Sequence, residues 1–195
     1  GKLVRVIKGH TSPVFSVCVT PDNKYVVSGS RDTTVRITRL DTGESVRVIK
    51  GHTNTILSVC VTLDNKLVVS GACDYTVRIT RFGTGKLFRV IRGHTDWVTS
   101  VCVTSDNKYV VSGSSDGTVR ITRLDNGQVV RVIKGHTNWV WSICVTSDNK
   151  YVVSGSDDYT VRITRLDTGE LVGVINTGPV RSVCVSSNQH QIITG

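Results

Sequence analysis

The chain has 195 residues, of which 38% are hydrophobic and 20% are charged, and its formal net charge is +9. This length is enough for a sizeable core, and the chain is too polar for a membrane span, so we expect a soluble protein without a membrane partner. No charged-then-apolar leader precedes the strand pattern at Leu3, and the first residue is Gly1. We therefore expect the numbering to start inside a longer protein.

A repeat of 42 residues organises the chain, because the pair Gly-His recurs at 9/10, 51/52, 93/94 and 135/136. Four full units span 1–42, 43–84, 85–126 and 127–168, and a partial fifth unit spans 169–195. The first and fourth units differ at only nine of 42 positions. The fifth has lost two residues near Asn176 and stops after about two strands. Such self-similarity predicts a repeat architecture.

Each unit shows four short strand patterns separated by turn residues. In the first unit they cover 3–8, 14–20, 25–28 and 34–40, with Gly, Asp, Asn, Pro and Thr between them. No window has helical periodicity over two turns, so we predict an all-β protein. Within the first unit we expect the core to contain Val14, Val17, Cys18, Val19, Val26, Val27, Val35 and Ile37, with their equivalents in later units.

The sequence resembles the WD-repeat (WD40) family in lines such as GHTNWVWSICVTSDNKYVVSGSDDYTVRITRLDTG, and the resemblance covers essentially the whole chain. It implies a β-propeller of four-stranded antiparallel blades that pack face to face around an axis. We thus expect 1–195 to be a single propeller or a fragment of a larger one. Because the fifth unit ends early, three arrangements of the propeller stay open. Residues beyond 195 complete a larger ring, another chain covers the open ends, or the ring has five blades with a gap.

The chain departs from the family at the Trp-Asp pair that ends the third strand. Thr-Arg stands there in every full unit, at 38/39, 80/81, 122/123 and 164/165. In the family, that Trp joins a His, a Ser or Thr and an Asp in a hydrogen-bonded set. The resemblance carries the other three members to His10, Ser28 and Asp32; His52, Ser70 and Asp74; His94, Ser112 and Asp116; and His136, Ser154 and Asp158. Because an emptied Trp site costs about 3–5 kcal/mol, we expect water or a neighbouring side chain to fill each space.

The sequence favours a protein without catalytic residues, metal or cofactor. Asp, His and Ser have the composition of a hydrolase triad, but their repetition at turn and strand positions favours a structural role. Five cysteines share one column, which we interpret as packing between blades: Cys18, Cys60, Cys102, Cys144 and Cys184. Cys73 lies instead in a turn, so we expect it to be the most reactive thiol. The absence of a disulfide framework and of glycosylation acceptors favours a cytoplasmic location.

The units differ from one another mainly in four columns, which mark positions that the fold does not dictate. They are Pro13, Thr55, Trp97 and Trp139; Phe15, Leu57, Thr99, Trp141 and Arg181; Arg31, Cys73, Ser115 and Asp157; and Thr33, Tyr75, Gly117 and Tyr159. The family resemblance places these columns on the top face of the propeller. Aromatic and Arg side chains are typical of binding hot spots. We therefore predict a partner-binding surface of Phe15, Arg31, Tyr75, Trp97, Trp139, Trp141, Asp157, Tyr159 and Arg181.

These features predict a non-enzymatic scaffold or recognition module that binds a protein or peptide. Two alternatives stay open. One is a structural subunit that self-associates through its open blade ends, head to tail, into a filament or larger ring. The other is a basic rim that binds an acidic partner or nucleic acid, because 20 of the 24 Lys and Arg fall in the columns of Arg5, Lys8, Lys24, Arg36 and Arg39.

Overall fold

The computed structural model describes residues 5–186 and 191–195. Within these ranges the chain forms strands and no helix, which confirms the all-β prediction, and no helix able to cross a membrane occurs there. The first sheet holds β1 (Val14–Val19), β2 (Tyr25–Ser30), β3 (Val35–Arg39) and β4 (Ser45–Ile49). The second sheet holds β5 (Ile56–Val61), β6 (Leu67–Ala72), β7 (Val77–Arg81) and β8 (Leu87–Ile91).

Two further four-stranded sheets and one two-stranded sheet complete the described chain. The third sheet holds β9 (Val98–Val103), β10 (Tyr109–Ser114), β11 (Val119–Arg123) and β12 (Val129–Ile133). The fourth holds β13 (Val140–Val145), β14 (Tyr151–Ser156), β15 (Thr160–Arg165) and β16 (Leu171–Asn176). The last holds β17 (Val183–Val185) and β18 (Ile192–Thr194). All neighbouring strands are antiparallel and follow chain order, as expected for strands joined by short turns.

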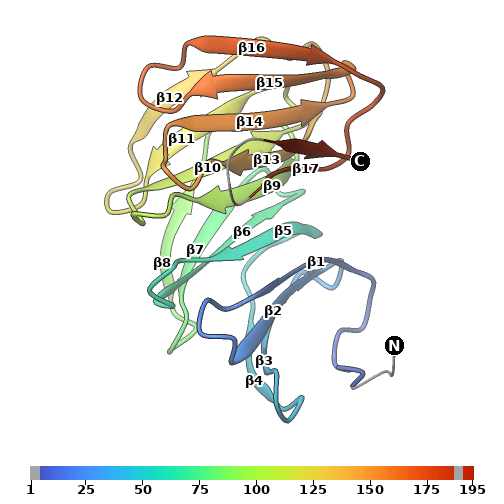
Figure 1. The fold of residues 1–195 in the computed structure, drawn as a ribbon. Helices are drawn as coiled ribbons and strands as arrows, with labels where there is room; N and C mark the ends of the chain where they lie inside the picture. The colour runs from blue at the N-terminus through green and yellow to red at the C-terminus, as the bar shows by residue number, and fades with distance from the viewer. Residues whose placement is uncertain (1–4, 187–190) are drawn as a thin grey trace.

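The sheets follow one another as blades in an open arc (Figure 1). The first strand of each blade packs against the first strand of the next, in the series β1, β5, β9, β13 and β17. These strands therefore lie along the inside of the arc. The arrangement is that of a propeller, with β1 at one end of the arc and the two-stranded sheet at the other, and the described residues do not close the ring.

Neighbouring blades lock together through a glycine in the second strand. A Cβ atom on Gly71 would lie 2.6 Å from Val98 Cγ1 and 2.9 Å from Val101 Cγ1, so only glycine admits these two side chains. The backbone N–H of Val101 also donates a hydrogen bond to Ser58 Oγ at 3.0 Å. We call this arrangement, a glycine that admits two side chains of the next blade, the glycine socket. It recurs at Gly29, Gly113 and Gly155.

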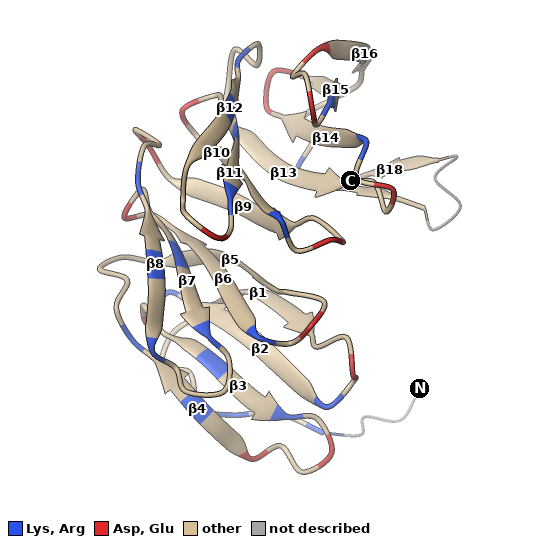
Figure 2. Ribbon diagram, turned by 90° about the vertical axis from the view of Figure 1, so that its left-hand side faces the viewer, with Lys and Arg blue, Asp and Glu red and all other residues tan. Residues whose placement is uncertain are grey.

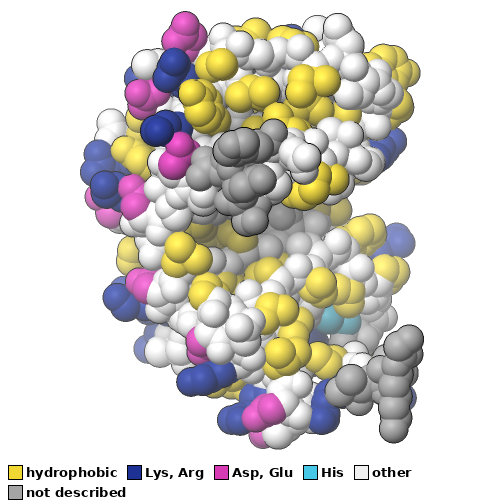
Figure 3. All heavy atoms as spheres, in the orientation of Figure 1, with side chains coloured by type: hydrophobic (Ala, Val, Ile, Leu, Met, Phe, Trp, Pro, Cys, Tyr) yellow, Lys and Arg dark blue, Asp and Glu magenta, His cyan; other side chains and the backbone are white. Residues whose placement is uncertain are grey.

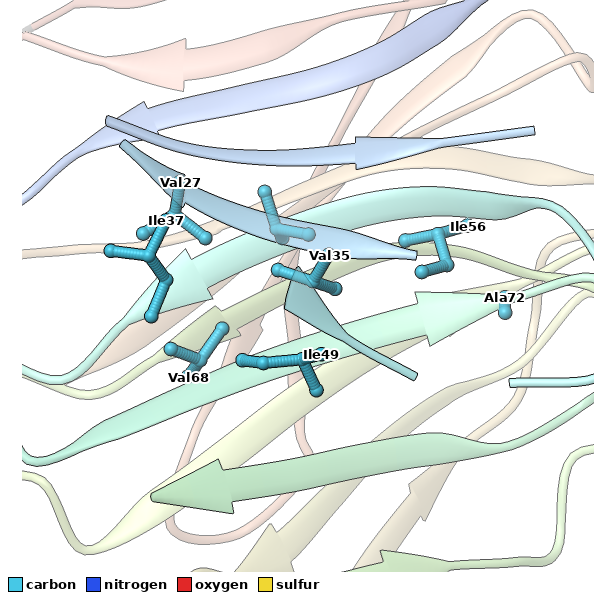
Figure 4. Packing of buried hydrophobic residues seen from close by; sticks show 8 residues of the cluster. Val27, Val35, Ile37, Ile49, Ile56, Val68 and Ala72 are labelled. Carbon is cyan, nitrogen blue, oxygen red and sulfur yellow. The ribbon is translucent and has the colours of Figure 1, made fainter. Parts of the chain in front are cut away.

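Each blade interface encloses a cluster of apolar side chains, most of them Val and Ile. Between the first two blades, the cluster contains Val27, Val35, Ile37, Ile49, Ile56, Val68 and Ala72 (Figure 4). The predicted core members Val27, Val35 and Ile37 are fully buried there. Equivalent clusters lie between the later blades. Because every cluster is shared by two sheets, each blade depends on its neighbours for its core.

The core prediction is wrong for the first strand of the first unit. Val14, Val17 and Val19 are exposed, Cys18 is half-buried, and Val26 of β2 is also half-buried. The positions of Cys18 and Val19 are only half-buried in the later units too, at Cys60, Val61, Cys102, Val103, Cys144 and Val145. No described blade precedes β1, so this face of the sheet has nothing to pack against, and hydrophobic side chains gather on the surface over β1 and β2 (Figure 3). The equivalents of Val14 and Val17 in the next three units are buried: Ile56, Val59, Val98, Val101, Val140 and Ile143.

Candidate functional site

The variable columns lie together at one end of every blade, which we call the upper face. The first strand begins there and the second strand ends there, because Val14 pairs with Ser30. The backbone N–H of Arg31 donates to the carbonyl of Pro13 at 2.9 Å, which joins the loop before the first strand to the turn after the second. The same bond recurs between Cys73 and Thr55, Ser115 and Trp97, and Asp157 and Trp139.

The His, Asp and Ser of each full unit hold the upper face together. In the second unit, His52 Nδ1 lies 2.8 Å from Asp74 Oδ2, and His52 Nε2 lies 2.8 Å from Ser70 Oγ. Burial alone would raise the pKa of Asp74, but hydrogen bonds from His52, Thr76 and the backbone of Thr53 hold that pKa well below its ordinary value. The other three sets repeat this geometry.

These sets match the distances of a Ser-His-Asp triad, but their setting is different. Ser70 and His52 are both buried beneath the upper face, so a substrate has no direct approach to that hydroxyl. In the first unit His10 and Ser28 are half-buried and line a cavity of about 490 Å³. The carboxylate of Asp74 also accepts hydrogen bonds from the Thr53 backbone and the Thr76 hydroxyl, at 3.0 and 2.7 Å. The set therefore ties a loop to a turn. Among the described residues, no three His, Cys, Asp or Glu side chains are grouped to hold a metal ion.

The three tryptophans form one continuous aromatic cluster on the upper face, across the third and fourth blades. The ring centroids of Trp97 and Trp139 are 5.6 Å apart, and those of Trp139 and Trp141 are 5.4 Å apart, in tilted arrangements. The guanidinium of Arg181 lies 4.4 Å from the Trp141 ring centroid and 3.4 Å from Asp157 Oδ1. Five of the predicted site residues thus form one connected group of rings and charges.

A cavity of about 370 Å³ extends this cluster toward the first two blades. Its walls include Phe15 and Arg31 from the first unit and Trp97 and Trp141 from the third and fourth units. The cavity is also lined by Asn54, Thr55, Leu57 and Cys73, none of which was predicted as a site residue. Three of these four stand in the variable columns, which was the only signal available for them. Asn54 was not predicted, although its column also varies between the units, as Ser12, Asn54, Asp96 and Asn138.

The cluster presents aromatic surface that the fold leaves partly uncovered. Trp97 and Trp139 are 37% and 36% exposed, and Phe15 is 54% exposed. The indole Nε1 of Trp141 is buried and has no hydrogen-bond partner among the described residues. A partly exposed aromatic group with a polar rim is typical of a surface that binds another molecule.

The remaining predicted site residues, Tyr75 and Tyr159, occupy an unusual backbone conformation. Both have φ of 67°, in the left-handed region that favours glycine, and Gly117 occupies the equivalent turn of the third unit. Both tyrosines are exposed. Packing does not explain bulky side chains at such a turn. They belong to turns of the upper face, and among the described residues no ring contact joins them to the tryptophans.

The space that the family's Trp would occupy is largely filled in the second blade, which lies between two other blades. Thr80 is buried, and the cavity beside it measures only about 20 Å³, lined by Arg78, His52 and Leu87 among others. This volume is about that of one water molecule. Neighbouring side chains therefore take up most of the space, as expected. The expectation is not met at Thr38, where the equivalent space belongs to a cavity of about 490 Å³, because no described blade covers that face.

The structure does not support the expectation for Cys73. Its side chain is buried, and burial, followed by the nearby charges of Asp74 and Asp96, raises the pKa of its thiol to about 11. Among the described cysteines Cys184 is the exposed one. The other members of the column are half-buried between blades, and burial raises the pKa of each: Cys18, Cys60, Cys102 and Cys144.

Many of the basic side chains have acceptors within the fold. Arg47 donates to the carbonyls of Gly83 and Thr84 in the next blade, at 2.6 and 3.1 Å. Arg39 pairs with Asp41 at 2.6 Å. Basic residues lie on strands and turns, whereas acidic residues lie in the turns and loops (Figure 2). The lysine at the position of Lys24 in each unit pairs with an Asp two residues earlier. These pairs are Lys24–Asp22, Lys66–Asp64, Lys108–Asp106 and Lys150–Asp148.

Comparison with known proteins matches the family described as WD domain, G-beta repeat, at residues 1–38, 43–80, 85–122 and 127–164. Similar curated proteins include the pre-mRNA-splicing factor PRP46 of Eremothecium gossypii, 52% identical over 44 residues, and that of Yarrowia lipolytica, 46% identical over 43 residues. PRP46 of Kluyveromyces lactis is 50% identical over 44 residues. Each match covers 22% of this chain and 10% of the relative, so it spans about one repeat.

Proposed function

Because this chain belongs to the WD40 repeat family, we propose that it is a non-enzymatic recognition module that binds a protein or peptide partner on its upper face. The family and the PRP46 relatives support a general role as an interaction scaffold. The observation that carries the finer proposal is the aromatic cluster of Trp97, Trp139 and Trp141 beside a cavity of about 370 Å³. We also infer that residues 1–195 act as one unit, since each blade shares its core with the next.

The chemistry of the cavity favours a large apolar side chain of the partner. Phe15, Leu57 and Trp97 offer apolar walls, and Arg31 stands among them with a charged group. Such a mixture buries an apolar anchor while the rim fixes the polar backbone beside it.

The named role of the relatives in pre-mRNA splicing is not part of this proposal, because each match covers a single repeat. A basic rim for nucleic acid is also less favoured. Arg39, Arg47 and Lys66 already have acceptors or acidic partners in the fold, which leaves less free charge to neutralise phosphates. A cytoplasmic location stays a prediction.

The proposal is tested by selecting binders from a random peptide display library on the immobilised 195-residue chain. Affinities of the selected peptides are then measured for the wild type and for Phe15→Ala and Trp139→Ala, which truncate the cavity wall and the middle ring of the cluster. We expect each substitution to weaken binding by about tenfold or more, as for hot-spot residues.

Leu63→Ala is the matched control, because Leu63 is equally exposed but lies in the turn between β5 and β6, at the opposite end of the blade. Its binding should equal that of the wild type. Selected peptides that bind all four proteins equally would place the binding surface elsewhere and refute the proposal.

A further inference from the structure

We propose that the partner of the upper face carries an arginine, and that its guanidinium enters a second cavity, of about 230 Å³, beside the aromatic cluster. This inference rests on the proposed function, because it adds a second contact to the same binding surface. The cavity lies between the turn after β10 and the loop before β13, at the interface of the third and fourth blades. Trp139, the middle ring of the cluster, is part of its wall.

The cavity lies where the third unit lacks a side chain that the other full units have. Gly117 is one of its lining residues. A Cβ on Gly117 would lie 3.1 Å from the carbonyl oxygen of His136 and 3.6 Å from that of Asn138. A larger side chain at this position would therefore begin against the same loop that lines the cavity and would take up its space. The other full units have such a side chain, with the same left-handed backbone: Thr33, Tyr75 and Tyr159.

The wall of the cavity carries negative charge and hydrogen-bond acceptors. Burial opposes ionisation of Asp116, but hydrogen bonds hold the pKa of this carboxyl below its ordinary value, so it is charged at neutral pH. The carbonyl of His136 accepts no hydrogen bond from the described part of the chain. Burial lowers the pKa of the His136 imidazole, so this ring adds no positive charge at neutral pH. Arg162 packs against Gly135 of the same loop and does not line the cavity.

A guanidinium matches this combination of groups. It is planar, it stacks on aromatic rings, and its five N–H donors serve several acceptors at once. The upper face already holds one guanidinium in this way, because that of Arg181 lies 4.4 Å from the Trp141 ring centroid and 3.4 Å from Asp157 Oδ1. A partner arginine would meet the same two chemical groups in Trp139 and Asp116. An acidic side chain would be repelled by the carboxylate and the carbonyl oxygens.

The two cavities of the upper face share the tryptophan cluster. Trp97 and Trp141 line the cavity of about 370 Å³, and Trp139 lines the cavity of about 230 Å³. Ring contacts with centroids 5.6 and 5.4 Å apart join Trp139 to the other two. One partner segment can therefore place an apolar side chain in the larger cavity and an arginine in the smaller one.

The probes for the test are peptides selected from the random display library on the wild-type chain. Each arginine of a selected peptide is replaced in turn by citrulline, which keeps the shape of the side chain and removes its charge. We expect the selected peptides to contain arginine. Replacement of the arginine that enters the cavity should weaken binding to the wild type by about tenfold, measured by calorimetry.

Gly117→Tyr is the variant that fills the smaller cavity, and the turn accommodates tyrosine because the chain itself has it at Tyr75 and Tyr159. This variant should bind the arginine peptide about tenfold more weakly than the wild type does. Citrulline should weaken its binding little further, because the contact is already lost. Circular dichroism checks folding, and Gly117→Thr, which copies the first unit, replaces Gly117→Tyr if that protein unfolds.

Gly83→Tyr is the matched control. No described atom lies within 4 Å of the place that a Cβ would take on Gly83, in the turn between β7 and β8 at the opposite end of the blade. This variant should bind the arginine peptide as the wild type does and should show the full loss with citrulline.

The outcomes separate this inference from the proposed function. Peptides that lose affinity for Phe15→Ala, but lack arginine or tolerate citrulline at every position, would overturn the inference and leave the proposed function standing. A Gly117→Tyr protein that binds the arginine peptide as tightly as the wild type would do the same. Peptides that bind the wild type, Phe15→Ala and Trp139→Ala equally would refute the proposed function, and this inference with it.

Discussion

At the residue scale, the hydrogen-bonded sets were predictable and the state of individual thiols was not. His94, Ser112 and Asp116 recur at fixed spacing, and the family resemblance alone assigns them to one set. In the structure His94 lies 2.8 Å from Asp116 Oδ2 and 2.8 Å from Ser112 Oγ. Cys73 sits in a turn, where sequence favours exposure. Its burial depends on side chains of the adjoining blade that line the same cavity. The sequence of the second unit alone therefore cannot predict this burial.

We predict that Asp116→Asn lowers the free energy of unfolding at neutral pH by about 2 kcal/mol, because charged hydrogen bonds from His94, Thr118 and Thr95 are weakened. Burial opposes ionisation, but these bonds hold the pKa of Asp116 below its ordinary value. The ionised group therefore stabilises the fold above a pH of about 4, and this contribution is lost as pH falls through the folded pKa.

Urea unfolding at neutral and acidic pH measures both effects. The free energy of unfolding of Asp116→Asn should fall less between neutral and acidic pH than that of the wild type. The control is Asp125→Asn, an exposed carboxylate paired with Arg123 at 3.3 Å, which should leave stability close to that of the wild type. An Asp116→Asn protein as stable as the wild type at neutral pH would contradict the role assigned to the set.

We predict that Tyr159→Gly separates binding from folding. A non-glycine residue in the left-handed region costs about 1–2 kcal/mol, while glycine costs about 0.5–1 kcal/mol in chain entropy. The variant should therefore be as stable as the wild type or more stable by up to about 1 kcal/mol, measured by thermal unfolding. Its affinity for library-selected peptides should fall. A clear loss of stability would mean that the ring packs in the fold.

At the element scale, strand order and turns followed from the sequence, whereas the exposure of β1 did not. The alternation of Val17, Cys18 and Val19 is the same as in the later units, so sequence assigned them the same burial. Burial of a blade face is decided by the neighbouring blade. For β1 that neighbour is not among the described residues, and the same pattern of side chains faces outward.

We predict that Gly71→Ala destabilises the protein by about 1–3 kcal/mol, the usual range for overpacking a core. The new methyl group would meet Val98 and Val101 across the blade interface, at 2.6 and 2.9 Å. Gly173→Ala is the matched control, because its nearest neighbour, Ile163 Cδ1, is 3.6 Å away in ordinary contact. Chemical denaturation that gives equal midpoints for the two variants would contradict the glycine-socket account.

At the scale of the whole molecule, four near-identical blades form an open arc on which the variable positions meet. The period of 42 residues predicted this architecture, and the columns that vary predicted which residues would differ on its upper face. Sequence did not indicate that Trp97 and Trp141 share a cavity with Phe15, because this depends on how far the arc brings the first blade toward the fourth. Tyr75 and Tyr159 lie in turns of the upper face and have no ring contact with the tryptophans among the described residues.

The tryptophan fluorescence of the chain tests the central claim most directly, because all three tryptophans of the protein belong to the proposed binding surface. A selected peptide should shift the emission on titration and reach saturation at the affinity measured independently by calorimetry. A peptide that binds by calorimetry but leaves the emission unchanged would contradict the assignment of partner binding to this cluster.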